Sequence, residues 1–236
     1  MSSTFEAGRF GSGHAVHRIE DAALLAGQGR YTDDVPAAGE TVLAFLRSPY
    51  AHARIVSVDT TAARALPGVL AAYTGAELAA AGVKPIPSID VFKRADGSAL
   101  ATPPRRALAH ERVRFVGEAV AAVVAESRDA ARDACEAIVV DYEELPSVND
   151  AVSAMRQGAA VICPEAPDNI AAEMRHGDAA ATRLAFERAA HVVSLDLVNQ
   201  RVAPSSIEPR SVLAETDPSS GRLTVRLSSQ MPTAVM

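Results

Sequence analysis

Residues 119–148, AVAAVVAESRDAARDACEAIVVDYEELPSV, carry the strongest secondary-structure pattern of the 236-residue chain. The near-continuous apolar run at 119–125 is typical of a strand that is covered on both faces. Ser127 then precedes a stretch rich in alanine, and its hydroxyl predicts the N-cap of a helix over 128–138. Because a second apolar run follows at once, we expect a strand, a helix and a strand that form a right-handed β-α-β unit.

Shorter elements are expected upstream of this unit. Alternating apolar side chains predict strands at 42–47, 53–59 and 69–74, with a short helix between the last two. Thr74 and Glu77 have the spacing of a capping box, in which a hydroxyl and a carboxylate satisfy free amides at the start of a helix. Residues 84–104 contain four prolines and no sustained period, so we expect a long surface loop there.

A second unit is expected downstream, after a short helix at 149–158 and a connector that contains proline. Helical spacing at 177–190 leads into three stretches with strand patterns, at 191–203, 211–217 and 221–230. We therefore expect an α/β (α+β) protein with four parts: an N-terminal arm at 1–17, a domain at 18–150, a connector at 151–175 and an incomplete domain at 176–236.

The composition limits the classes of partner. The chain has 23 Lys and Arg against 29 Asp and Glu, a net charge of −6, so it offers no broad basic field to phosphates or anionic lipids. We expect neither nucleic acid nor a membrane surface as a partner. No apolar run approaches the roughly 20 residues that cross a bilayer, and the first residues lack an apolar signal segment, which favours a cytoplasmic location.

The common motifs of catalytic and metal sites do not occur in the sequence. Cys135 and Cys163 form neither a CxxC pair nor a ligand quartet, so disulfide, zinc and iron–sulfur sites are unsupported. The glycine pairs match no nucleotide loop, no serine lies in a GxSxG elbow, and the pair His14 and His17 lacks a third ligand. We therefore expect no catalytic residue and no metal ligand within this chain.

Two kinds of charged cluster leave alternatives open. Acidic residues at 33–34 and 141–144 suit acid–base chemistry, but solvated ends of strands account for them equally well. Glu208 and Arg210 flank a proline directly before an apolar strand, a position from which they could orient a ligand. A structural ion pair at the edge of a loop is an equal alternative for these two residues.

Three stretches in continuous order carry a resemblance to a known family. They are RIEDAALLAGQGRYTDD at 18–34, RSPYAHARIVSVD and ALPGVLAAYTGAEL within 47–78, and RVRFVGEAVAAVVAESRDAARDACEAIVVDYEELPSV at 112–148. Together they resemble the α/β hammerhead domain of the molybdenum hydroxylases, which include xanthine dehydrogenases, aldehyde oxidases and carbon monoxide dehydrogenase-like large subunits. NQRVAPSSIEPRSVLAE at 199–215 and LSSQMPT at 227–233 resemble the first strands of that family's molybdopterin-binding domain.

The resemblance implies oxidation of a small molecule, of the aldehyde, purine or N-heterocycle, or CO type, at a molybdopterin centre with molybdenum. It also implies electron transfer to iron–sulfur and FAD subunits or domains, and it places Glu208 and Arg210 beside the cofactor site. The family's GGGFG loop does not occur in these residues. We therefore expect the chain to be inactive and free of molybdenum without the remainder of the molybdopterin-binding subunit; a non-catalytic binding or assembly module is the alternative.

Overall fold

The computed structural model describes residues 18–88, 92–94, 96–200, 202–231 and 233. The expected arm at 1–17, with its two histidines, lies outside the described residues. The chain divides into a central unit, residues 39–194, and a terminal unit, which combines residues 1–38 with residues 195–236. The division into four parts expected from the sequence stays a prediction.

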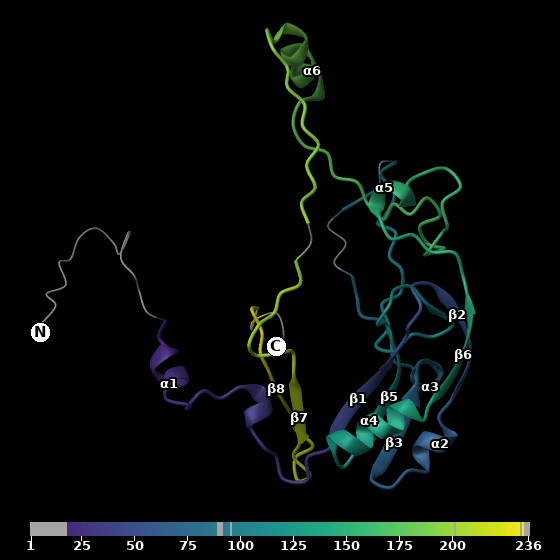
Figure 1. The fold of residues 1–236 in the computed structure, drawn as a ribbon, viewed down its shortest axis with the longest axis vertical. Coiled ribbons are helices and arrows are strands. Elements are labelled where there is room, and N and C mark those ends of the chain that lie inside the picture. The colour runs from purple at the N-terminus through teal and green to yellow at the C-terminus, as the bar shows by residue number, and fades with distance from the viewer. Residues whose placement is uncertain (1–17, 89–91, 95, 201, 232, 234–236) are drawn as a thin grey trace, which may run out of the picture. The chain divides into compact units, whose positions relative to one another are not determined.

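The central unit contains two three-stranded antiparallel sheets (Figure 1). The first sheet has the order β1 (Val42–Arg47), β5 (Ala119–Ala125), β3 (Val69–Thr74). The second has the order β4 (Arg112–Val113), β2 (Ala53–Asp59), β6 (Val139–Glu144). The strands expected at 42–47, 53–59 and 69–74 are thereby confirmed.

The expected β-α-β unit is wrong, although its three elements exist. Such a unit places both strands parallel in one sheet, whereas β5 and β6 lie in different sheets and every pairing between strands of the described residues is antiparallel. The physical reason is that both edges of β5 are occupied, by β1 and by β3. The strand after the helix therefore has to pair elsewhere, and it pairs with β2.

The central unit contains five helices among its described residues, of which the first three lie between strands and the last two follow β6. They are α2 (Thr61–Arg64), α3 (Gly75–Ala80), α4 (Arg128–Glu136), α5 (Ala151–Ala154) and α6 (Ala179–Arg188). The two predicted caps are present: the Thr74 hydroxyl accepts from the Glu77 amide at 3.2 Å, and the Ser127 hydroxyl accepts from the Ala130 amide at 3.2 Å. The stretch at 84–104 forms only isolated bridges among its described residues, as expected of a loop.

The main core lies between α4 and one face of the first sheet (Figure 1). Ala131, Ala134 and Cys135 of α4 are buried against alternate residues of β5, namely Ala121, Val123 and Ala125. Small side chains on both elements allow this close approach of helix and sheet. A second, smaller core joins Val120 of β5 to residues of the other sheet: Ala53 and Val113, together with Ala109.

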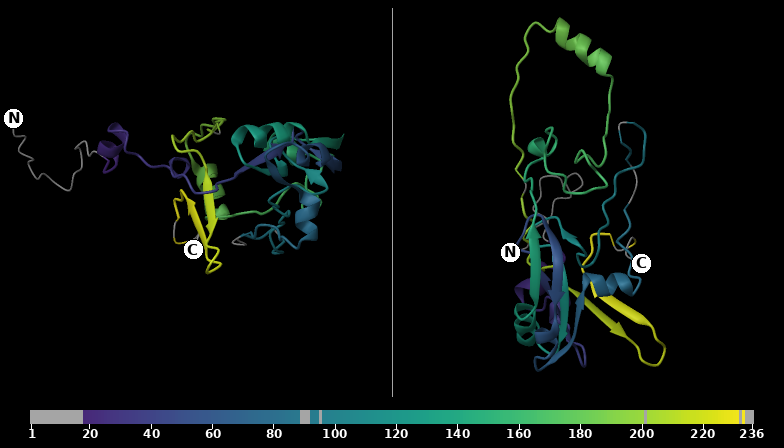
Figure 2. Two further views of the ribbon diagram at one scale, coloured as in Figure 1. Left: turned by 90° about the horizontal axis from the view of Figure 1, so that it is seen from below. Right: turned by 90° about the vertical axis from the view of Figure 1, so that its right-hand side faces the viewer.

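The terminal unit contains α1 (Asp21–Leu25), the 3₁₀ helix η2 (Thr32–Asp34) and a hairpin of β7 (Val212–Thr216) and β8 (Leu223–Leu227). The two strands of the hairpin pair in antiparallel orientation (Figure 2). Both strands were expected from the sequence, at 211–217 and 221–230. Asp217 begins the turn, and its carboxylate accepts hydrogen bonds from the Ser219 amide and hydroxyl at 2.8 and 2.7 Å.

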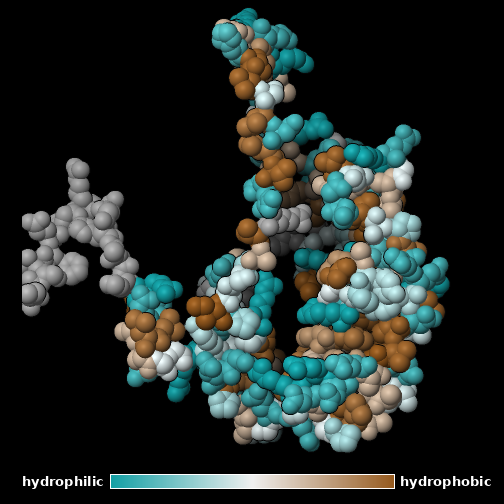
Figure 3. All heavy atoms as spheres, viewed as in Figure 1, coloured by the Kyte–Doolittle hydropathy of each residue, from teal (hydrophilic) through white to brown (hydrophobic). Residues whose placement is uncertain are grey.

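The strand expected at 191–203 does not form. Its described residues have no regular structure, although the odd-numbered side chains Val193, Leu195 and Leu197 have the alternation of a half-buried strand. A strand needs a hydrogen-bonded neighbour, and the described residues pair no strand with this segment (Figure 2). Its apolar side chains are consequently exposed, as the brown residues after α6 in Figure 3 show.

Candidate functional site

Glu208, the first of the two expected site residues, binds through its carboxylate to a segment of the terminal unit that is distant in sequence. Its Oε1 accepts a hydrogen bond from the Thr32 amide at 3.0 Å and a second from the Thr32 hydroxyl at 3.3 Å. Thr32 is buried, and it opens η2. The carboxylate therefore satisfies the first amide of this short helix across 176 positions of sequence.

Arg210 is exposed, and within the described part of the chain it forms no ion pair with Glu208. The structural alternative considered for the two residues, a Glu–Arg pair, is thus replaced by a link from Glu208 to Thr32. The segment is further ordered by the Ser206 hydroxyl, which donates to the Glu208 carbonyl at 2.7 Å. A role of Glu208 and Arg210 beside a cofactor stays a prediction.

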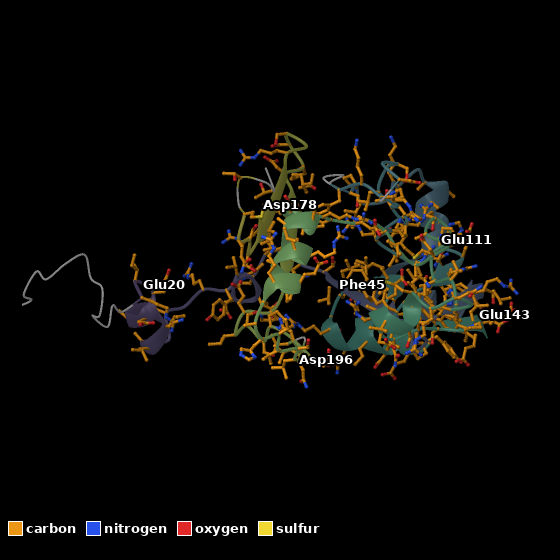
Figure 4. The ribbon with its side chains drawn as sticks, turned by 90° about the horizontal axis from the view of Figure 1, so that it is seen from above. Glu20, Phe45, Glu111, Glu143, Asp178 and Asp196 are labelled. Atoms are coloured by element: carbon orange, nitrogen blue, oxygen red, sulfur yellow. The ribbon has the colours of Figure 1, made fainter. Side chains whose placement is uncertain are left out.

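One carboxylate of each acidic cluster has a hydrogen-bond partner within its own unit. Asp34 belongs to a capping box of η2, in which its carboxylate accepts from the Tyr31 amide at 3.0 Å. In the central unit, the carboxylate of Glu143 on β6, a residue labelled in Figure 4, accepts from Arg54 Nε on β2 at 2.7 Å. Both carboxylates therefore already hold secondary structure in place.

A charged cavity of about 460 Å³ lies in the central unit, between β2, β4 and the segments at 104–111 and 164–165. Four arginines and three glutamates line it: Arg54, Arg106, Arg112, Arg114, Glu111, Glu118 and Glu165. Sequence reasoning missed this cluster because its members come from four separated segments and form no motif. The nearly balanced charges favour mutual neutralisation rather than a strong field of one sign.

The titratable groups near this cavity lack the features of a nucleophile. Burial raises the pKa of Glu118, although the Arg114 amide donates to its Oε2 at 2.6 Å and opposes that shift. Burial also raises the pKa of the Cys163 thiol and, in the core under α4, of the Cys135 thiol, which keeps both protonated at neutral pH. The imidazole of His52 is buried, and its Nδ1 lies 2.6 Å from the Pro146 carbonyl. The burial and the hydrogen bonds of these groups indicate structural roles rather than nucleophilic catalysis.

Within the described ranges, no three His, Cys, Asp or Glu side chains are placed to hold a metal ion. The one carboxylate expected near a cofactor, that of Glu208, is engaged by Thr32. The described residues thus present no set of side-chain ligands for a metal ion, and no catalytic step is assigned to them. None of the helices in the same ranges combines the length and apolar composition needed to span a bilayer.

Two family models match consecutive parts of the chain. Residues 26–146 match the model described as "Aldehyde oxidase and xanthine dehydrogenase, a/b hammerhead domain", so both three-stranded sheets lie in a hammerhead domain. Residues 162–236 match the model described as "Molybdopterin cofactor-binding domain". The chain belongs to the molybdenum hydroxylase family, whose members are oxidoreductases.

Curated relatives align with nearly the whole chain. The nicotine 6-hydroxylase large subunit of Paenarthrobacter nicotinovorans is 40% identical over 222 residues, which cover 93% of this chain and 26% of the relative. The carbon monoxide dehydrogenase large chain of Afipia carboxidovorans is 36% identical over 235 residues, which cover 94% of this chain and 28% of the relative. The chain thus spans about a quarter of the length of these relatives.

Solved structures have the same fold over the same region. A crystal structure of Cu,Mo-CO dehydrogenase aligns with a TM-score of 0.78 and 35% identity, and covers 93% of this chain and 28% of that one. Quinoline 2-oxidoreductase from Pseudomonas putida 86 aligns with a TM-score of 0.77 and 36% identity, and covers 93% of this chain and 27% of that one. The resemblance inferred from the sequence is confirmed, as is the hammerhead fold.

Proposed function

We propose that the chain forms the N-terminal portion of a molybdenum-dependent hydroxylase or dehydrogenase. The complete enzyme would oxidise an aldehyde, a purine or other N-heterocycle, or a CO-type substrate, and pass the electrons to iron–sulfur and FAD partners in the cytoplasm. The observation that carries this proposal is the unbroken order of the two matches: a hammerhead domain at 26–146, then the start of a molybdopterin cofactor-binding domain at 162–236.

The role of the chain in that enzyme is architectural. Molybdenum in molybdopterin supplies the redox centre of the complete enzyme. Glu208 acts as a positioning residue here, because its link to Thr32 fixes the segment that leads into β7. Arg210, next to it and exposed, is available to the rest of the cofactor domain.

We expect activity to require the remainder of the large subunit. The terminal unit holds the start of the cofactor-binding domain, and its hairpin leaves apolar side chains that nothing in the described structure covers. In the β7–β8 register Val212, Ala214 and Thr216 face Leu227, Val225 and Leu223. Val212, Val225 and Leu223 are exposed in the described structure. A hairpin of two strands is at best marginally stable alone, so this sheet needs further strands or a covering layer.

The test is a comparison of two proteins produced in a molybdenum-replete host. One is the 236-residue chain, and the other is the same chain extended by the part of the nicotine 6-hydroxylase large subunit that it does not span. We expect elemental analysis to find near-stoichiometric molybdenum in the extended protein only. Near-stoichiometric molybdenum in the 236-residue chain would contradict the proposal that it is incomplete.

A further inference from the structure

The first sheet of the hammerhead domain has a second face, opposite α4, that is built from large apolar side chains. The strand register places Phe45 of β1 and Tyr73 of β3 on either side of Ala122 of β5. The next row places Leu43 beside Val124. Residues directly opposite one another in an antiparallel pair point to the same face, so these five side chains share one surface, which we call the outer face.

The side chains of the outer face are largely apolar, and several of them are nevertheless exposed to solvent. Leu43, Phe45 and Tyr73 retain 53%, 42% and 44% of their accessible surface. When one face of an antiparallel sheet is in water, its outward positions are normally polar. A contiguous apolar patch across three strands is typical of a surface that further protein covers.

A fixed cation lies at the rim of the outer face. The Arg47 guanidinium lies 5.8 Å from the centroid of the Phe45 ring, and its Nη1 donates to the Gly117 carbonyl at 2.9 Å. These two contacts hold the charge beside the aromatic ring (Figure 4 labels Phe45). A complementary partner would present apolar side chains to the sheet and a carboxylate to Arg47.

We propose that the outer face is the docking surface for the part of the large subunit that lies outside these 236 residues. The inference rests on the proposed function. The relatives are single large subunits of which this chain spans 26% and 28%, so about three quarters of such a subunit is available to cover the face. The docking segment is apolar and carries an acidic side chain opposite Arg47.

The experiment co-expresses the full chain, carrying an affinity tag, with the part of the nicotine 6-hydroxylase large subunit that the chain does not span. The probe is that second polypeptide, and its recovery with the tagged chain is measured. We expect Phe45→Lys to reduce recovery by about tenfold or more, because a charge replaces an apolar anchor at the centre of the contact. Arg47→Glu should reduce it by a smaller factor, by repulsion of the partner's carboxylate.

Val139→Lys is the matched control, since Val139 is an exposed valine on β6 of the other sheet. It should leave recovery unchanged. The melting temperature of each variant alone is measured as well, because Phe45→Lys also places a second cation beside Arg47. Arg47→Glu keeps Phe45 in place, so its reduced recovery separates lost docking from lost folding if Phe45→Lys lowers the melting temperature.

The outcomes distinguish this inference from the proposed function. Co-recovery that Phe45→Lys leaves intact would overturn the docking surface and leave the proposed function standing. Failure of the unaltered chain to recover the second polypeptide would count against both proposals. A dimer of the chain that Phe45→Lys dissociates, in the presence of the second polypeptide, would assign the outer face to a second copy and overturn the inference.

Discussion

Gly75, the first residue of α3, is a position where the backbone leaves no space for a side chain. A Cβ at this position would lie 2.0 Å from the Ala109 carbonyl oxygen and 3.0 Å from that of Leu108. Backbone atoms cannot move aside as a flexible side chain can. We expect Gly75→Ala to lower the free energy of unfolding by about 1–3 kcal/mol, measured by chemical denaturation of the full chain.

Ala76 provides the control for this substitution, because it is the next residue of the same helix and is exposed. Ala76→Ser should change the free energy of unfolding by no more than about 0.5 kcal/mol. A Gly75→Ala variant that is as stable as the unaltered chain, or more stable, would show that the gain in helix propensity outweighs the close approach of the two backbones.

The link between Glu208 and Thr32 gives a second prediction at the scale of single residues. Glu208→Ala removes the acceptor of the Thr32 amide, so hydrogen exchange at that amide should accelerate by about tenfold or more. NMR exchange measurements on the full chain would test this, with α4 amides as the internal reference. Arg210→Ala should leave exchange at Thr32 unchanged, and an equal acceleration in both variants would refute the assigned role of Glu208.

Sequence reasoning singled out Glu208 but could not find its partner. The local signal, a carboxylate and a guanidinium around a proline, suggested a pair with Arg210. The hydrogen-bond donor instead comes from Thr32, which precedes Glu208 by 176 positions and carries no local signal that points to Glu208. Contacts at that separation depend on how the chain folds back, which periodicity and spacing do not encode.

At the scale of elements, the turn of the β7–β8 hairpin should respond to acid. Hydrogen bonds from the Ser219 and Ser220 side chains and amides lower the pKa of Asp217 from 3.8 to about 2. Because the folded pKa lies below the unfolded value, the contribution of Asp217 to hairpin stability is complete above about pH 4. It is lost as the pH falls from there toward 2.

Carbon-13 NMR of the side-chain carboxyl, followed from pH 6 to pH 1.5, would measure this pKa directly, and amide shifts at 217–221 should move with it. Asp217→Asn should abolish the pH dependence of those amide shifts. A titration midpoint for Asp217 near 4 would contradict the hydrogen-bonded turn.

Elements with strong local signals were predicted well. The Ser127 cap and the alanine-rich stretch after it specify α4, and the capping box at Thr74 specifies α3. Pairing was predicted less well, because the edges of β5 are taken by strands from much earlier in the chain. The stretch at 191–203 has the alternation of a strand, but alternation does not supply the neighbouring strand that the hydrogen bonds require.

At the scale of the whole molecule, the two units should differ in resistance to proteolysis. The described residues at 190–200 lack regular structure and expose their apolar side chains, whereas α4 and β5 form a buried core. We expect limited digestion with thermolysin to cleave first within 189–203 and to leave a resistant fragment that contains residues 42–148. Mass spectrometry of the early fragments would locate the cuts; first cleavage inside 42–148 would refute this division of stability.

The central place of β5 between β1 and β3 also determines when the hammerhead domain can assemble on the ribosome. Both flanking strands are synthesised well before β5, so each waits as an unpaired strand until residue 125 has left the exit tunnel. Unpaired strands with apolar side chains are targets for chaperones and for aggregation. The time between the emergence of β3 and the emergence of β5 from the tunnel therefore sets how long the nascent chain is exposed to either.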